Sequence, residues 1–136
     1  MLKKSLLAVT AVGFLGTFAS GVFAIVPPKG CPKVSNLNKT IFTFAQYIPE
    51  DNEYVVGNIS DYGTLNRWGF IVARIQASDG GKALNLANKS MSTLSGNPDL
   101  YQHQNENFWQ CNYAIGKGYI AVAITPVPAN VRSFVH

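Results

Sequence analysis

The sequence predicts an α+β fold: an antiparallel β-sheet with one amphipathic helix packed on one face, in the order β-β-β-α-β-β, and one disulfide. Three observations predict it. Five segments are rich in β-branched and aromatic residues, and turn-forming residues separate them. One segment, between the third and the fourth of these, repeats its apolar residues at helical spacing. The only two cysteines lie far apart in the chain.

The first 24 residues are typical of a cleaved secretory signal peptide. Lys3 and Lys4 precede an apolar stretch over residues 5–18, and small residues in Val22-Phe23-Ala24 stand where a signal peptidase cuts. Glycines interrupt an apolar run that is already shorter than the ~20 residues needed to span a bilayer. We therefore expect an exported protein, periplasmic or secreted, with no membrane span after cleavage.

Cleavage would leave residues 25–136, a length that suits one domain. Residues 25–39 contain three prolines and are expected to form an extended arm, and residues 40–136 are expected to form the single α+β domain. An oxidising compartment makes a disulfide between Cys31 and Cys111 the default expectation. In the chain-entropy model, closing a loop of this size contributes ~4 kcal/mol.

The first half of the domain contains three strand candidates. Residues 40–47 are rich in β-branched and aromatic side chains, and residues 54–60 end at the turn Asp61-Tyr62-Gly63. Residues 68–77 alternate most regularly, which predicts a strand in a sheet with one covered face. The face expected to be apolar consists of Ile71, Ala73, Ile75 and Ala77.

A helix is predicted over residues 82–94, after the glycine-containing turn at residues 78–81. Its apolar residues recur every three or four positions, and Gly96 and Pro98 end the pattern. We expect this stripe to cover the sheet. The stripe consists of Leu84, Ala87, Met91 and Leu94.

The last two strands are predicted over residues 108–115 and 119–125, joined as a hairpin by Gly116-Lys117-Gly118. A polar loop over residues 96–107 precedes them. Both faces of the final strand are largely apolar, which predicts a central position in the sheet.

The composition argues against several classes of function. Of the 11 Lys and Arg residues, two lie in the signal peptide and the others are scattered singly, so we expect no nucleic-acid partner. The two histidines, His103 and His136, belong to no zinc, nucleophile or metalloprotease motif. We therefore expect neither an enzyme nor a structural metal site.

The most unusual stretch of the mature chain runs from Tyr101 to Trp109, from a polar loop into an aromatic strand. One interpretation is the rim of a ligand site, in which His103 and Tyr101 are candidate axial ligands to a haem iron. Phe108, Trp109 or Tyr113 would then offer flat apolar surface to the macrocycle. The alternative is a solvated loop that enters a strand whose aromatic side chains fill the core.

The chain resembles a family of small exported proteins from intracellular Gram-negative bacteria, some of which are called hemin-binding proteins (the Hbp-like family). The residues behind this resemblance are the arm Pro27-Pro28-Lys29-Gly30-Cys31-Pro32, the strand Phe108-Trp109-Gln110-Cys111, the two-lysine signal and the single pair of distant cysteines. The resemblance implies a periplasmic, surface or released protein that binds haem. It assigns no ligand residue, and the chain contains no Cys-x-x-Cys-His motif.

Together these observations predict a small, monomeric, exported binding protein whose ligand is haem or another flat apolar molecule. No cofactor is predicted beyond haem as a bound ligand. The alternative is a secreted protein-interaction or inhibitor module of the cell envelope, which would bind its protein partner through an exposed face or edge of the sheet.

Overall fold

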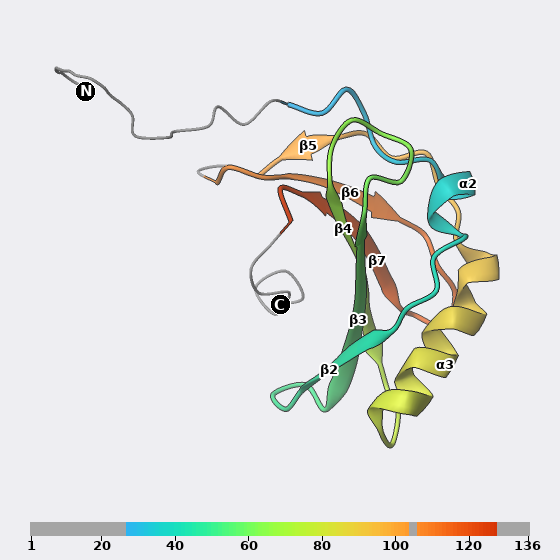
Figure 1. The fold of residues 1–136 in the computed structure, drawn as a ribbon. Coiled ribbons are helices and arrows are strands. Elements are labelled where there is room, and N and C mark those ends of the chain that lie inside the picture. Colours follow the sequence, from blue (N-terminus) through green and yellow to red (C-terminus); the bar gives the residue numbers. More distant parts are fainter. Residues whose placement is uncertain (1–26, 104–105, 128–136) are drawn as a thin grey trace, which may run out of the picture.

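The computed structural model describes residues 27–103 and 106–127, and Figure 1 shows their arrangement. The predicted signal peptide and His136 lie outside the described residues. Within these residues, two helices, one 3₁₀ turn and six strands follow one another. In order they are α2 (Val34–Leu37), β2 (Phe44–Ile48), β3 (Glu53–Ser60), β4 (Trp68–Ile75), α3 (Gly80–Ser90), η1 (Met91–Thr93), β5 (Tyr101–Gln102), β6 (Trp109–Tyr113) and β7 (Ile120–Thr125).

The six strands form one antiparallel sheet in the order β2-β3-β4-β7-β6-β5. The antiparallel sheet, the helix between strands and the disulfide confirm the predicted class. As expected, β7 is central and pairs with β6 in the hairpin. The predicted order omits α2 and β5, because elements of four and two residues are too short to establish a period in the sequence.

A β-bulge in β4 changes which side chains share a face. Tyr54 pairs with Ile75 but Val56 pairs with Val72, so two residues of β4 oppose one residue of β3. Arg74, inside the bulge, has a φ of 66°. The predicted face of Ile71, Ala73, Ile75 and Ala77 is therefore wrong from the bulge onward, and Ile75 packs on the same side as Val72.

The helix α3 begins at Gly80, where the Asp79 side chain accepts a hydrogen bond from the Lys82 backbone N–H at 2.9 Å. It ends at Ser90 and continues as the 3₁₀ turn η1, so it begins about half a turn before the predicted helix over residues 82–94 and ends about one turn before it. Ala83 and Ala87 are buried, whereas Leu84 of the predicted stripe is only half-buried.

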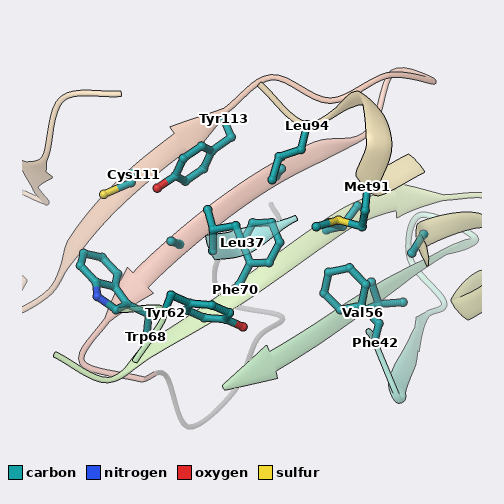
Figure 2. Packing of buried hydrophobic residues seen from close by; sticks show 14 of the residues in the cluster. Leu37, Phe42, Val56, Tyr62, Trp68, Phe70, Met91, Leu94, Cys111 and Tyr113 are labelled. Carbon is teal, nitrogen blue, oxygen red and sulfur yellow. The ribbon is translucent and has the colours of Figure 1, made fainter. Parts of the chain in front are cut away.

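The main core lies between α3 and one face of the sheet, and Figure 2 shows its central side chains. Phe70 is in the middle of an aromatic group. Its ring centroid lies 5.7 Å from that of Phe42, 6.0 Å from that of Tyr62 and 6.2 Å from that of Tyr113. These rings come from segments far apart in sequence, so they join the two halves of the chain.

The disulfide fixes the N-terminal arm to this core. Cys31 and Cys111 are bonded, with their Cα atoms 5.9 Å apart, as predicted. The Tyr113 hydroxyl donates a hydrogen bond to the Pro32 carbonyl. Where the sequence predicts an extended arm, residues 34–37 form the helical turn α2, which buries Leu37 completely.

The opposite face of the sheet has a smaller apolar cluster. Phe108 packs against it. Ile71, Val122 and Ile124, at its centre, are buried. Its members are Ile48, Val55, Ile71, Ala73, Val122 and Ile124. We call this surface the second face, and it positions the candidate site described next.

Candidate ligand-binding site

The strand pairing of β5 with β6 decides which of the predicted site residues meet. Tyr101 pairs with Gln110, and Gln102 pairs with Trp109. Directly paired residues of antiparallel strands project to the same face, and consecutive residues project to opposite faces. Tyr101 and Gln110 therefore share the second face, and Trp109 lies on the other.

Three rings lie together at the β5 edge. The centroid of the His103 ring is 5.2 Å from that of Tyr101 and 4.2 Å from that of Phe108. A backbone hydrogen bond of 3.2 Å from His103 N–H to the Phe108 carbonyl extends the strand pairing beyond β5. Tyr101 is 41% exposed, and His103 and Phe108 are half-buried. We call Tyr101, His103 and Phe108 the ring cluster.

Side-chain amides connect the ring cluster to β6. His103 Nε2 lies 2.6 Å from Gln110 Oε1, and Gln110 Nε2 donates to Asn112 Oδ1 at 2.7 Å. Asn112 Nδ2 in turn donates to the Tyr101 hydroxyl at 3.5 Å. Because an amide oxygen can only accept, this arrangement places the proton of neutral His103 on Nε2 and its lone pair on Nδ1.

Two of the predicted ligand-binding residues do not join the ring cluster. Trp109 is half-buried on the opposite face, and Tyr113 is a core residue with 8% of its surface exposed. Burial raises the pKa of the Tyr113 hydroxyl, which is bonded to the Pro32 carbonyl. The structure therefore brings Tyr101 and His103 together and leaves Trp109 and Tyr113 apart from them.

Gln110 and Asn112 contact the predicted residues but were not predicted. They alternate with Trp109, Cys111 and Tyr113 along β6, so polar and apolar side chains take opposite faces of the strand. That alternation is the sequence signal that could have identified them. Their partners are His103, which follows β5, and Tyr101 in β5, a strand too short to be predicted from the sequence.

Three hollows in the described part of the chain lie away from the ring cluster. A groove of about 610 Å³ separates the arm from the loop after β3, and one of about 420 Å³ lies beside Ile41. A third, of about 250 Å³, lies over β3 and β4. The ring cluster is thus a partly exposed surface at the edge of the sheet.

Within residues 27–103 and 106–127, no three His, Cys, Asp or Glu side chains are grouped as ligands for a metal ion. In the same part of the chain, no helix is both long and apolar enough to cross a membrane.

Comparison with known proteins identifies a family. Neither the curated proteins nor the solved structures include a match to this chain. A family model described as a domain of unknown function (DUF4949) matches residues 30–129, which include the arm cysteine, the whole sheet and the ring cluster. The chain therefore belongs to the DUF4949 family.

Proposed function

We propose that the protein is an exported binding protein whose ring cluster binds a flat apolar molecule, with haem as the leading candidate. The observation that supports this proposal is His103, whose ring lies between Phe108 and Tyr101 while Gln110 fixes one of its nitrogens. Export is supported by the signal-like leader and by the disulfide, which belongs to oxidising compartments.

The residues of the ring cluster fit a haem in two respects. A histidine that binds a metal commonly donates its other ring N–H to a carbonyl or carboxylate, which sets the tautomer. The Nε2–H of His103 already does this to Gln110, so its Nδ1 lone pair is the candidate ligand. Tyr101, the second candidate, projects from the same face.

The chain supplies flat apolar contact as well as a ligand atom. Phe108 packs against His103 on one side and against the second-face cluster on the other, so its ring has a fixed position. A macrocycle bound here would cover the exposed part of Tyr101 and part of Phe108. The iron of a bound haem would supply an open coordination position for one protein ligand.

Titration with haemin, followed at the Soret band, tests this proposal. The oxidised mature chain (residues 25–136) is expected to bind one haemin saturably. His103→Ala should weaken the binding by a decade or more, about 1.4 kcal/mol, because it removes the ligand nitrogen. Gln110→Ala should weaken it less, because the imidazole remains but its orientation is no longer fixed.

Tyr47→Ala is the matched control. Tyr47 is 44% exposed, close to Tyr101 at 41%, but lies on β2 at the opposite edge of the sheet. Its removal should leave haemin affinity unchanged. The proposal is wrong if haemin binds with no fixed stoichiometry, or if His103→Ala and Tyr47→Ala bind it equally well.

A second candidate function, protein binding at the β2 edge, is supported by a different observation. Ile41, Phe44 and Tyr47 are all exposed large apolar side chains on or beside this outer strand. Residues 40–48 contain no charged side chain and no proline, the residues that usually protect an edge strand from pairing. If protein binding at the β2 edge is the function, haemin would bind at no specific site. His103→Ala would then leave the affinity for the protein partner unchanged.

A further inference from the structure

An apolar hollow lies on the second face, over β3 and β4. Its volume is about 250 Å³, and none of the described residues that line it is charged. Gly57, Gly69 and Ile71 line its base, and Phe44, Ile59 and Val127 are among the side chains around them.

Two glycines in neighbouring strands keep the hollow open. Gly57 pairs with Ile71, and Gly69 pairs with Ile59, so the two glycines are diagonal neighbours on one face. Glycine weakens the interior of a strand, and it is often found there where a ligand or another backbone approaches closely. Two of them in one hollow are therefore unexpected in a sheet built only for stability.

The backbone does not require glycine at position 57. Gly57 is not among the described glycines with positive φ, so its conformation is open to any residue. A Cβ atom there would lie 3.6 Å from the Phe70 carbonyl oxygen and 3.9 Å from Ile71 Cγ1, which are ordinary contacts. The absence of a side chain at this position leaves room above the strand and has no other structural explanation.

Apolar side chains next to the hollow remain exposed to water. Phe44 is 52% exposed and Ile59 is 47% exposed. An apolar molecule in the hollow would cover parts of both and would replace water over Gly57, which is half-buried, whereas Gly69 is already buried. For scale, a dry cavity of roughly 150 Å³ in another protein holds a benzene molecule.

We propose that this hollow binds a small uncharged apolar molecule, of the size of one substituted aromatic ring. The site is separate from the ring cluster and does not depend on the proposed function. The row of paired residues Gly69, Ile124, Gln110 and Tyr101 crosses the sheet, so three strand spacings, about 14 Å, separate the two.

Titration with p-xylene, followed by amide chemical shifts of the oxidised mature protein, tests the proposal. We expect saturable shifts at Gly57, Gly69 and Ile71, with a dissociation constant on the order of 1 mM for so small a hydrocarbon. Gly57→Val should weaken binding at least tenfold, because its methyl groups would occupy the hollow. Gly30→Val, at a glycine with nothing within 4 Å of an added Cβ, should bind p-xylene like the wild type.

A second variant keeps the test decisive if Gly57→Val fails to fold. Ile59→Ser changes an exposed side chain beside the hollow, and it should weaken binding about threefold or more without altering the fold. The proposal is overturned if p-xylene causes no saturable shifts at these amides. It is also overturned if folded Gly57→Val or Ile59→Ser binds p-xylene as tightly as the wild type. A hollow that binds only a side chain of a protein partner, and no p-xylene, would overturn it too.

Discussion

The disulfide is expected to supply much of the stability of this small domain, and its removal gives the most quantitative prediction. The bond joins Cys31 to Cys111, with a sequence separation of 80 residues. In the chain-entropy model, opening a loop of this length lowers the free energy of unfolding by about 4.5 kcal/mol. That amount is a large part of the 5–15 kcal/mol that is typical of a whole domain.

Cys31→Ala combined with Cys111→Ala removes the bond without placing a hydroxyl group in the core, where Cys111 is completely buried. Urea unfolding of the variant and of the oxidised wild type measures the difference. With a urea dependence of about 1.5 kcal/mol per molar, the midpoint should fall by about 3 M. Wild-type protein reduced with dithiothreitol should show a similar loss.

A loss below about 1 kcal/mol would refute this reasoning. It would mean that the unfolded chain without the bond retains enough structure to limit its own freedom, so that the bond has little entropy left to remove. The urea dependence of the cysteine-free variant would then stay close to that of the oxidised wild type, because a compact unfolded chain exposes little additional surface.

Two further predictions concern stability. Asn88→Ala removes the side chain that accepts from the Phe42 N–H at 2.8 Å and donates to its carbonyl at 3.3 Å. The variant should lose about 1–3 kcal/mol in urea unfolding, while exposed Lys89→Ala loses almost nothing. Burial raises the pKa values of Tyr62 and Tyr113. The unfolded chain therefore releases these protons at a lower pH than the folded protein does. The free energy of unfolding should stay constant below pH ~10 and fall above it, and it should fall less in Tyr113→Phe. An unchanged urea midpoint at pH 11 would contradict this.

Much of the fold follows from patterns that are local in the sequence. The apolar residues on both faces of β7 and the glycines after β6 predict a central strand and its hairpin, and both are present. The pattern fails where a single residue changes the period. The bulge at Arg74 turns Ile75 to the opposite face from the one that strict alternation assigns, and only the pairing of β4 with β3 determines it.

The candidate site was predicted in part. Tyr101 and His103 are predicted as candidate haem ligands, and the structure places their rings side by side. Trp109 and Tyr113 are predicted as flat apolar surface for the macrocycle, but strand alternation and the core position of Tyr113 direct them elsewhere. Gln110 was missed because its role depends on a cross-strand contact with His103.

Sequence patterns do not predict the hollow at Gly57 and Gly69 either. Each glycine by itself is an ordinary interruption of a strand. Only the register between β3 and β4 shows that both open onto one surface beside Phe44 and Ile59. A search for diagonal pairs of strand glycines becomes possible only when the pairing is known.

Amide chemical-shift mapping with gallium protoporphyrin, a diamagnetic counterpart of haemin, tests the central claim most directly. The account predicts one bound molecule per chain, with the largest shifts at Tyr101, His103 and Gln110 and their loss in His103→Ala. Shifts centred instead on Gly57 and Gly69, or spread over the surface without saturation, would contradict a haem site at the ring cluster.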